Sequence, residues 1–408
     1  MQFHALSLAE AGGDVDLVGL EGAPVHAAIA AQPRITQRRL PDAAYRSRAD
    51  GGVRRFVVLS AFRAAAQAWG LFWMLRRLPR PDVILVQNPP AVPTLAVAWL
   101  VARLRGSRLI IDWHNLAHTI AAVRLGDTHR AVRALARSER RWSRRADGHL
   151  AVSQALANWL LREYGATATV LYDRPLRSFE PPGAEKRQAL WRKLATAGVV
   201  PEVGHPFRGA GNPVPLVVCP TSWTPDEDFD LLLEALERAE RALGGGGKPS
   251  GLPEGSLKLS LVLTGRGELR DAFETRLSKR TLSAIRVRTA WIEPEDYPVL
   301  IGMADLGLCL HQSSSGLDLP MKIADFRGPG VPVAAYDYAP VLSEALTNGS
   351  EGVTFKDPGQ LANLLVALAT GNADPDGPLA RSRQWIASHP SPRWDDQWRS
   401  VAAPVFNR

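Results

Sequence analysis

Short apolar runs alternate with helical patterns along almost the whole chain, and this alternation limits the fold more than any other feature. Each run has the length of a β-strand, and stretches of helical length separate the runs. Strands are predicted at residues 16–20, 83–87, 108–112, 149–152 and 169–172, and again at 216–219, 259–264, 285–288, 306–310 and 333–336. Strands that alternate with helices favour parallel sheets with crossover helices. The sequence therefore predicts an α/β fold.

The length of the chain and one irregular segment predict two domains. A chain of 408 residues is too long for one comfortable hydrophobic core. Residues 178–212 are rich in proline, glycine and charge, and they carry only one short helical pattern. They are interpreted as a hinge between a first domain at residues 1–177 and a second that begins at residue 213. Because ligands bind at the carboxyl ends of strands in open α/β sheets, we expect a cleft that faces both sheets.

Two turns in the second half have the pattern of anion-binding sites. One follows strand 306–310, the other follows strand 259–264, and each leads into a helical pattern. Their residues are Ser313, Ser314, Ser315 and Gly316 in the first turn, and Gly265, Arg266 and Gly267 in the second. Backbone N–H groups and the positive end of a helix can bind a phosphate at such a turn. One turn alone would be an ordinary connection, but two in one half predict a nucleotide-type ligand.

Further polar residues stand at the ends of three other predicted strands. They are Gln87 and Asn88, then Asp112, His114 and Asn115, and finally Thr221, Ser222 and Trp223. Gln87 and Asn88 could bind a sugar, although the prolines that follow explain the loop by themselves. Imidazole has a reference pKa near 6.5, which suits a general base at neutral pH. For His114 this role and that of a hydrogen-bonded structural histidine both stay open.

The acidic run after Trp223 is interpreted as the start of a helix. Thr224 suits the N-cap and Pro225 the first helical position, and residues 226–228 supply carboxylates to the first turn. Because helix-start chemistry accounts for the three acids, no metal site is predicted there.

Composition narrows the classes of partner and compartment. The net charge is +8 and the isoelectric point is about 9.8, but the basic residues are spread through helices without an aromatic-studded stripe. Nucleic acid is therefore not expected as a partner, whereas phosphate-rich ligands and anionic membranes suit this charge. Cys219 and Cys309 lie in strand-like runs, which predicts buried thiols in a reducing compartment. No run reaches the roughly 18 apolar residues that span a bilayer.

Two predicted helices, at residues 62–78 and 91–104, are unusually apolar. The first contains Trp69, Phe72 and Trp73 and ends in two arginines. Such helices can pack on a parallel sheet, or they can lie in a membrane surface with their arginines at the edge. The sequence leaves both interpretations open.

Taken together, these segments resemble the chitobiosyldiphosphodolichol β-mannosyltransferase family, whose members begin mannose addition to the dolichol-linked precursor of N-glycans. The matching motifs run in the family's order along nearly the whole chain. They are QNPP at 87–90, IIDWHN at 110–115, LYDRP at 171–175, TSWTPDEDF at 221–229, TGRG at 264–267, EDYP at 295–298, ADLGLCLHQSSSGLDLPMK at 304–322 and RWDDQW at 393–398. The SSSGLDLPMK block is highly specific.

The resemblance implies a GT-B fold, in which two Rossmann-like domains face a cleft. The second domain, residues 213–385, would bind the donor, the first would bind the acceptor, and a helix within residues 386–408 would cross back to the first. The implied reaction moves mannose from GDP-mannose to GlcNAc2-diphosphodolichol. GDP-mannose is α-linked and the product is β1,4-linked, so the reaction inverts the anomeric carbon and needs one general base without a covalent nucleophile. His114 and Asp112 are the candidates.

The turns and the resemblance together imply the binding residues. Donor candidates are Ser222, Trp223, Gly265, Arg266, Gly267, Ser313, Ser314, Ser315, Gly316, Asp318, Lys322 and Asp325, and acceptor candidates are Gln87, Asn88, His114 and Asn115. Arg266 and Lys322 are expected near the diphosphate. No cofactor and no protein-bound metal is expected to be required, although a divalent cation could accompany GDP. The implied location is the cytosolic face of the endoplasmic reticulum membrane, with other early dolichol-pathway mannosyltransferases as candidate partners.

The sequence departs from the family pattern in three places. After Asn115 the family usually has a Gly-Tyr pair, whereas Leu116, Ala117 and His118 follow here. A first strand, a glycine-rich loop and a membrane anchor are expected before Met1 and are missing. GT-B enzymes often carry two glutamates eight positions apart near the donor, whereas Asp318 and Asp325 here are seven apart and shorter. Another GT-B nucleotide-sugar transferase and a catalytically inactive, membrane-associated family member are therefore kept as alternatives.

Overall fold

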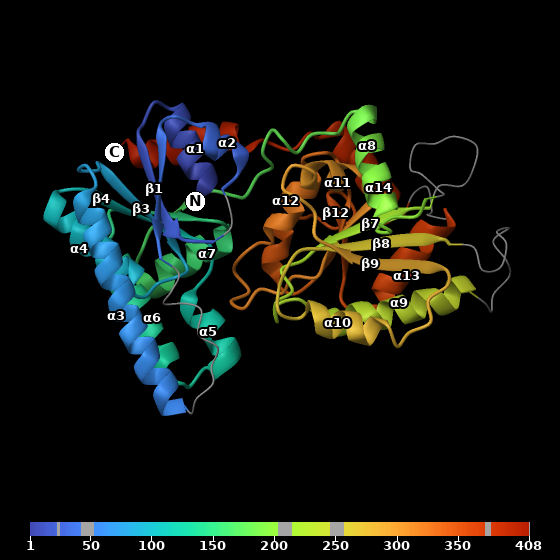
Figure 1. The fold of residues 1–408 in the computed structure, drawn as a ribbon, viewed down its shortest axis with the longest axis horizontal. Helices are drawn as coiled ribbons and strands as arrows, with labels where there is room; N and C mark the ends of the chain where they lie inside the picture. Colours follow the sequence, from blue (N-terminus) through green and yellow to red (C-terminus); the bar gives the residue numbers. More distant parts are fainter. Residues whose placement is uncertain (23–24, 42–52, 203–213, 245–256, 372–376, 408) are drawn as a thin grey trace. The chain divides into compact units, whose positions relative to one another are not determined.

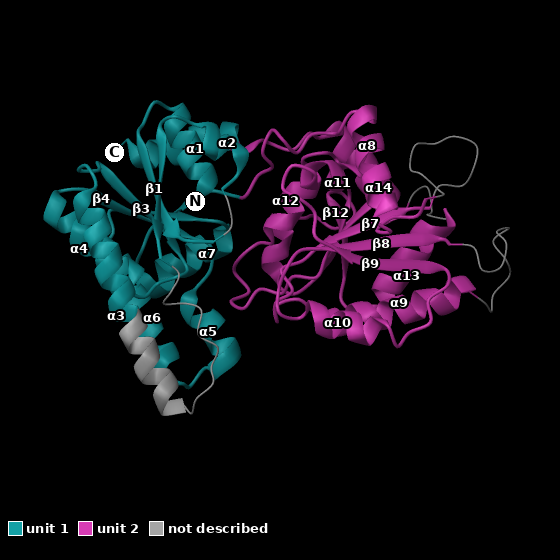
Figure 2. Ribbon diagram, in the orientation of Figure 1, with its two compact units in different colours: residues 1–172, 395–408 teal, residues 173–394 magenta. Residues whose placement is uncertain are grey.

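The computed structural model describes residues 1–22, 25–41, 53–202, 214–244, 257–371 and 377–407, with the backbone alone for residues 53–63. The chain divides into two compact units (Figure 2). Unit 1 comprises Met1–Tyr172 and Asp395–Arg408, and unit 2 comprises Asp173–Trp394. Unit 2 thus begins before the predicted hinge. The described part of that hinge, residues 178–202, belongs to unit 2, where helix α8 (Ala184–Thr196) packs against α11 (Tyr297–Met303); residues 203–212 lie outside the described residues.

Unit 1 contains six described strands, all in parallel pairs. They are β1 (Val15–Leu20), β2 (Ile35–Leu40), β3 (Val83–Asn88), β4 (Arg108–Trp113), β5 (Gly148–Ala151) and β6 (Thr169–Val170). The order β3-β4-β5-β6 forms one sheet, and β1 pairs with β2 in a second. The last five residues of β4 are buried, as expected for a strand covered on both faces of a parallel sheet.

The helices of unit 1 connect these strands. They are α1 (Gln2–Glu10), α2 (Ala27–Ala31), α3 (Val53–Arg77), α4 (Thr94–Arg105), α5 (Ala117–Leu125), α6 (Arg130–Ser143) and α7 (Gln154–Trp159), with a π-helical turn at Leu160–Tyr164. Helix α4 packs against β3 and β4, α7 packs against β5 and β6, and α6 contacts both α4 and the π-helical turn. The chain ends with α15 (Trp394–Gln397), a π-helical turn (Trp398–Ala402) and α16 (Ala403–Phe406). Arg108 of β4 donates to the carbonyls of Val405 and Phe406, at 3.0 and 3.1 Å.

Unit 2 is built on one sheet of six described parallel strands. They are β7 (Leu216–Pro220), β8 (Leu259–Thr264), β9 (Ile285–Ala290), β10 (Leu306–Cys309), β11 (Val333–Tyr336) and β12 (Gly352–Phe355). Their order is β12-β11-β10-β7-β8-β9. Successive strands run outward from β7 in one direction and from β10 in the other, so the topology reverses between β7 and β10. Such a reversal is where open α/β sheets bind ligands.

Helices cover both faces of the unit 2 sheet (Figure 1). Besides α8 and α11 they are α9 (Phe229–Gly244), α10 (Arg270–Leu277), α12 (Met321–Arg327), α13 (Pro358–Thr370) and α14 (Pro378–Ser388). Leucines of α9 and α13 pack with the strands in one extended core. Cys219 and Cys309 are buried free thiols, as predicted. Among the described helices, none is long and apolar enough to cross a membrane.

Candidate active site

The loops after β10, β7 and β8 meet at the point where the sheet of unit 2 reverses direction. These strands are neighbours, and hydrogen bonds join their loops. The amide of Gln312 donates to the carbonyl of Asp226 at 2.7 Å, and the amide of Leu269 donates to that of Trp223 at 3.1 Å. Both predicted anion-binding turns therefore lie beside the loop after β7, which begins with Thr221, Ser222 and Trp223.

A buried carboxylate, Glu227, joins two of these loops. It accepts hydrogen bonds from the Thr221 hydroxyl at 2.5 Å and from the amides of Ser222 and Trp223 at 3.0 and 2.9 Å. Lys322, in the first turn of α12 directly after the loop that follows β10, forms an ion pair with it. The predicted helix start is therefore wrong, because α9 begins at Phe229 and Glu227 serves the loops instead.

The actual cap of α9 is the next acid along the chain. Asp228 accepts from the amide of Leu231 at 2.9 Å, which is the bond that an N-cap side chain makes. Thr224 and Pro225 lie before the helix, not at its first positions. The sequence pattern thus located a cap within the acidic run but placed it four residues too early.

The glycines after β8 are required by close approach of two backbones. A Cβ on Gly265 would lie 1.8 Å from the carbonyl oxygen of Thr221, and a Cβ on Gly267 would lie 2.0 Å from that of Ser222. No side chain fits at either position. Between them Arg266 is exposed, and its guanidinium lies 3.9 Å from the centre of the Trp291 ring.

The serine loop after β10 is folded around Asp318. Ser313 and Ser315 donate their hydroxyls to Oδ1 of Asp318, the second at 3.3 Å, and the amide of Gly316 donates to the Ser313 hydroxyl at 2.8 Å. Gly316 has a φ of +69°, which glycine adopts without strain. Ser314 lies half-buried in the same loop. The predicted donor residues Ser313, Ser315 and Asp318 thus form one network, which fixes the loop's backbone.

A half-buried histidine that the sequence analysis did not single out as a site residue completes this network. Nδ1 of His311 lies 3.1 Å from Oδ2 of Asp226, and its Nε2 lies 3.1 Å from Oδ2 of Asp318. Burial opposes the charged imidazole, but the two carboxylates outweigh it and raise the pKa of His311 to about 9. Burial would raise the pKa of Asp226, but hydrogen bonds from His311 and Thr224, together with the charge of His311, lower it to about 2. At neutral pH the loops therefore hold a histidinium.

This histidinium predicts a stability that declines in alkaline solution. The raised pKa means that its contribution is complete below about pH 6.5 and is lost as the pH rises through about 9. The shift corresponds to at most about 3 kcal/mol, at 1.36 kcal/mol per pKa unit. We expect the melting temperature to fall between those pH values in the wild type and to fall less in His311→Gln. His389→Gln, an exposed position of unit 2, should keep the wild-type slope; identical slopes for all three proteins would contradict the assignment.

The side chains of two predicted donor residues, Trp223 and Asp325, contact residues outside the serine loop. Trp223 was predicted to bind the donor, but its side chain is fully buried and stacks on Phe229 with 4.7 Å between ring centres. It also has a φ of +54°, so we correct its role to core packing. Asp325 accepts a hydrogen bond from the Tyr297 hydroxyl at 3.0 Å, and burial raises its pKa to about 7.

In unit 1 the candidate base is held by a buried carboxylate at the end of β4. Nε2 of His114 lies 2.8 Å from Oδ2 of Asp112, and Nε2 of His4 lies 3.2 Å from the same oxygen. Burial would raise the pKa of Asp112, but the charges and bonds of the two histidines hold it well below its usual range. An ionised carboxylate only accepts hydrogen bonds, so Nε2 of His114 carries a proton and Nδ1 is its basic nitrogen. The side chain of His114 is 21% exposed and that of Asp112 only 3%, which favours His114 as the group that meets a substrate.

The support behind Asp112 comes from both ends of the chain. His4 belongs to α1, and Nε1 of Trp398, in the C-terminal helical segment, donates to its Nδ1 at 3.0 Å. Because Nδ1 accepts that bond, the ring proton of His4 lies on Nε2, which faces Asp112. Sequence reasoning missed both residues, since neither stands near the DWHN motif in the chain.

One predicted acceptor residue is structural. Asn88 is fully buried and donates to Oε1 of Glu139 at 2.8 Å and to the carbonyl of Asn115 at 3.1 Å. The predicted contact between Asn88 and a sugar is therefore wrong, and its side chain instead joins β3 to α6. Glu139, in α6, also accepts from the amide of Ala117 at 2.7 Å and so fixes the start of α5. Gln87 and Asn115 are partly exposed near Asp112 and His114, Gln87 being paired in register with Asp112.

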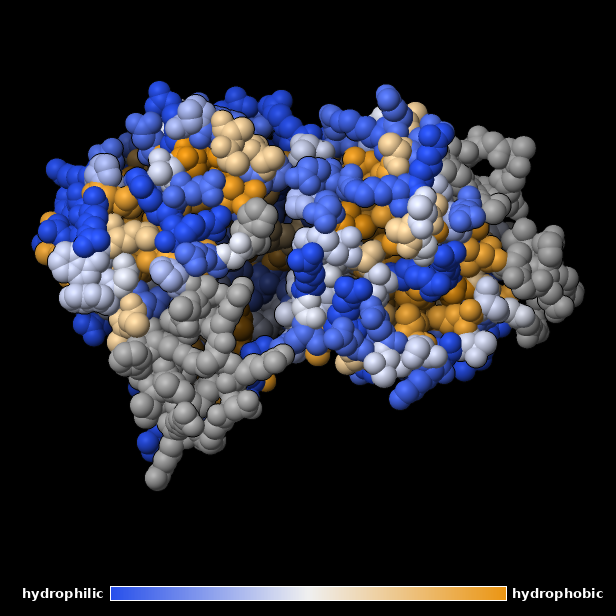
Figure 3. Space-filling view, viewed as in Figure 1, coloured by the Kyte–Doolittle hydropathy of each residue, from blue (hydrophilic) through white to orange (hydrophobic). Residues whose placement is uncertain are grey.

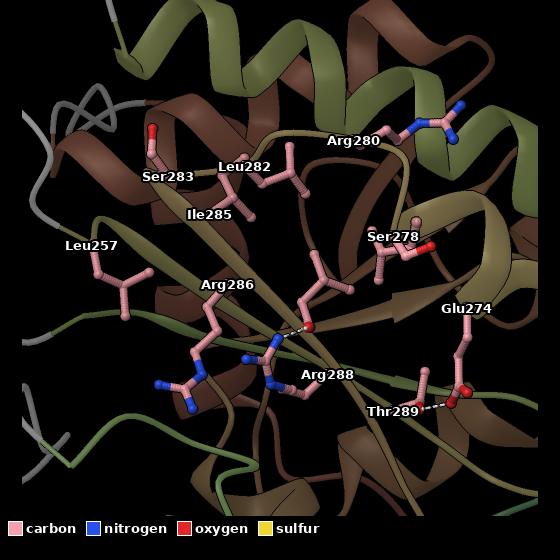
Figure 4. A pocket seen from close by; sticks show the side chains of 12 residues that line it. Leu257, Glu274, Ser278, Arg280, Leu282, Ser283, Ile285, Arg286, Arg288 and Thr289 are labelled. Atoms are coloured by element: carbon pink, nitrogen blue, oxygen red, sulfur yellow. Dashed lines mark hydrogen bonds between the residues drawn. The ribbon is translucent and has the colours of Figure 1, made fainter.

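A cavity of about 670 Å³ lies elsewhere on unit 2, along the edge strand β9 (Figure 4). Arg286, Arg288 and Leu257 line it, together with residues that follow α10. It does not include the loops after β7, β8 or β10, so we do not assign the donor to it. Figure 3 shows hydrophobic residues scattered among hydrophilic ones over the visible face of both units, which singles out no further site there. Among the described residues, no group of three or more His, Cys, Asp or Glu is placed to hold a metal ion.

Comparison with known proteins agrees with this architecture. Residues 5–172 match the model of the family described as a glycosyl transferase 4-like domain. Among solved structures, sucrose-phosphate synthase of Thermosynechococcus elongatus superposes with a TM-score of 0.63 at 15% identity, over 99% of this chain and 90% of that one. HepE of Anabaena in complex with UDP-glucose gives 0.61 at 15% identity, over 97% and 99%. The fold is thus the two-domain GT-B fold that was predicted, and the protein is a glycosyltransferase.

Sequence relatives identify the family. A chitobiosyldiphosphodolichol beta-mannosyltransferase of Mus musculus is 35% identical over 100% of this chain and 86% of that protein. Its counterpart in Homo sapiens is 34% identical over 99% and 89%. UDP-glycosyltransferase TURAN of Arabidopsis thaliana is 34% identical over 100% and 94%. The chain therefore belongs to the chitobiosyldiphosphodolichol β-mannosyltransferase family.

Proposed function

We propose that this glycosyltransferase moves mannose from GDP-mannose to GlcNAc2-diphosphodolichol, with inversion, to form Man-β1,4-GlcNAc2-diphosphodolichol. The observation that carries the proposal is the paired imidazole and buried carboxylate of His114 and Asp112 at the end of β4, in a chain whose relatives bear the name of this activity. An inverting transfer needs one base and no covalent intermediate. The intact pair also speaks against a catalytically inactive family member.

The chemistry follows from the two sites. Nδ1 of His114 would remove the proton of the acceptor 4-hydroxyl as that oxygen attacks the anomeric carbon. Asp112 would hold the imidazole in the right tautomer and stabilise the imidazolium that forms. In unit 2, backbone N–H groups of the serine loop and of Gly265–Gly267 would bind the diphosphate. The fixed charge of His311 and the exposed Arg266 would favour the negative charge that GDP gains on leaving.

A direct assay tests the function. The purified chain should transfer mannose from GDP-mannose to GlcNAc2-diphosphodolichol, and a β-specific mannosidase should release the sugar from the product. Calorimetry should show GDP binding in preference to UDP. Transfer from a UDP-sugar instead would establish the second candidate function, that of another nucleotide-sugar transferase. We retain this candidate because the Arabidopsis relative is named a UDP-glycosyltransferase.

The same assay tests the role of metal. We propose that no protein-bound divalent ion is needed, because cationic side chains and helix-start amides can neutralise the leaving diphosphate. Transfer should therefore persist in chelator. Complete loss that a divalent ion restores would count against this part of the proposal.

The acceptor that the relatives' names specify is linked to dolichol diphosphate, which supports a location at the endoplasmic reticulum. We propose the cytosolic face of that membrane for this chain, with its unit 1 on the lipid surface and other early dolichol-pathway mannosyltransferases as partners. Trp69 and Trp73 of α3, 66% and 41% exposed, support lipid contact by the first of the two apolar helices.

A further inference from the structure

Exposed hydrophobic side chains are distributed unequally between the two units. Of eleven large hydrophobic side chains that are exposed in the described part of the chain, nine belong to unit 1. Three of the nine lie on the nine-residue helix α5, where Ile120, Val123 and Leu125 are 44%, 61% and 47% exposed. Leu100 and Leu104 of α4 are two more. A helix that packs one face on a domain normally turns its apolar side inward, whereas α5 has no buried residue.

The neighbouring helix α6 carries a stripe of arginines. Arg130, Arg133, Arg137 and Arg140 recur every three or four residues, so they lie along one face of the helix. All four are exposed, while the buried residues Val132, Glu139 and Ser143 lie along a different face of the helix. No ion pair of a stripe arginine occurs within the described residues. Eight arginines and only two carboxylates stand between residues 117 and 145, and one of those carboxylates is the buried Glu139.

Aromatic side chains lie where α6 meets α4. The rings of Trp99 and Trp142 are 5.2 Å apart, and the guanidinium of Arg145 lies within 6 Å of both, at 5.9 and 5.6 Å. Tryptophan beside arginine is typical of protein segments at the boundary between lipid headgroups and acyl chains. Since α6 packs against both α4 and α5, the arginines, the indoles and the exposed aliphatic residues belong to one group of contacting helices.

We propose that this three-helix face, formed by α4, α5 and α6, docks on a bilayer that contains anionic lipids. Ile120, Val123 and Leu125 enter the interfacial region, and the arginine stripe binds headgroup phosphates. Either feature alone would be an ordinary solvated surface. Here the exposed aliphatic side chains and the arginine stripe lie on contacting helices. The aliphatic side chains suit the apolar interior of such a bilayer, and the arginines suit its anionic surface. The inference rests on the proposed function only in that the acceptor is membrane-borne, and it adds which helices meet lipid and which lipid charge they select.

Vesicle flotation of the full chain tests the docking face. Binding to phosphatidylcholine vesicles that contain phosphatidylserine should exceed binding to pure phosphatidylcholine, and added salt should weaken it. Arg130→Gln/Arg133→Gln/Arg137→Gln should lower the partition coefficient on anionic vesicles about 10²-fold, from the usual contribution of each arginine near such a surface. Lys186→Gln/Arg192→Gln/Arg241→Gln removes the same charge from exposed positions of unit 2 and should change little.

A second variant tests the apolar part. Ile120→Ser/Val123→Ser/Leu125→Ser should remove the binding that persists in high salt, and the exposure of these residues predicts a melting temperature near that of the wild type. Equal binding to neutral and anionic vesicles would overturn the proposal. So would equal loss in both charge variants, or selective binding of RNA without vesicles. Failure of the proposed function would show differently, as absent mannose transfer to detergent-solubilised acceptor in a wild-type chain that still floats.

Discussion

Replacing His114 by alanine is expected to lower mannose transfer about 10²–10⁴-fold, the usual effect of losing a general base. The imidazole is the exposed member of the pair at the end of β4, and its bond to Asp112 places the basic nitrogen on the side away from that carboxylate. GDP affinity should stay unchanged, because the loops assigned to the donor belong to unit 2. Single-turnover transfer and calorimetry with GDP measure the two quantities.

His129→Ala is the matched control for this variant. His129 is an exposed histidine of unit 1, and it caps α6 by accepting from the amide of Ala131 at 3.2 Å. Its loss should cost helix stability but little rate. If His114→Ala transfers mannose within a few-fold of the wild type, His114 is structural and the base must be sought elsewhere, with Asp112 first.

Replacing Glu227 by alanine is expected to cost about 3–5 kcal/mol of unfolding free energy, the range for removing one partner of a buried ion pair. The side chain of Glu227 is 1% exposed and that of Lys322 20%, so the ammonium would be left largely buried without its partner. Three hydrogen bonds to the loop after β7 would be lost as well. GDP binding should weaken together with stability, since that loop holds the glycines after β8. Urea unfolding and calorimetry are the measurements.

The adjacent acid provides the control for Glu227. Asp228→Ala removes the cap of α9 and should cost only about 1 kcal/mol. Adding Lys322→Met to Glu227→Ala should recover part of the loss, because the uncompensated charge disappears. If Glu227→Ala costs no more than Asp228→Ala and Lys322→Met recovers nothing, the ion pair does not organise the loops.

Strand positions were predictable where burial dictated the sequence. The strands β8 and β11 occupy the predicted residues, because buried parallel strands are continuous apolar runs. β2 was missed since its sequence ITQRRL is half exposed and strongly polar, and β12 since GVTF is short and opens with glycine. The helix α5 was missed because no residue with a capping side chain stands at its N-cap. Its start is fixed instead by the buried Glu139 of α6, which accepts from the amide of Ala117.

The sequence predicted only those parts of the site whose residues lie close together in the chain. Strand ends placed His114 and Asp112 together, and the two loop patterns led to Gly265 and Ser313. The partners of these residues could not be found in this way. His4 reaches Asp112 across the whole of β1 to β4, and His311 meets Asp226 across 85 positions of the chain. The predicted ligand contacts of Asn88 and Trp223 were wrong because both side chains are buried. A polar or aromatic residue at a strand end can point into the core as readily as into a cleft.

The bond from Trp398 to His4 has a consequence for synthesis on the ribosome. Unit 1 includes residues on both sides of unit 2 in the chain, so the support of Asp112 cannot form until residues 173–394 have been translated. At about 5–20 residues per second this delay is on the order of 10–40 s. During that interval α1 and β4 exist without the indole that fixes the tautomer of His4. The complete support of Asp112, and of the candidate base His114 that it holds, would therefore form only after the whole of unit 2 has been synthesised.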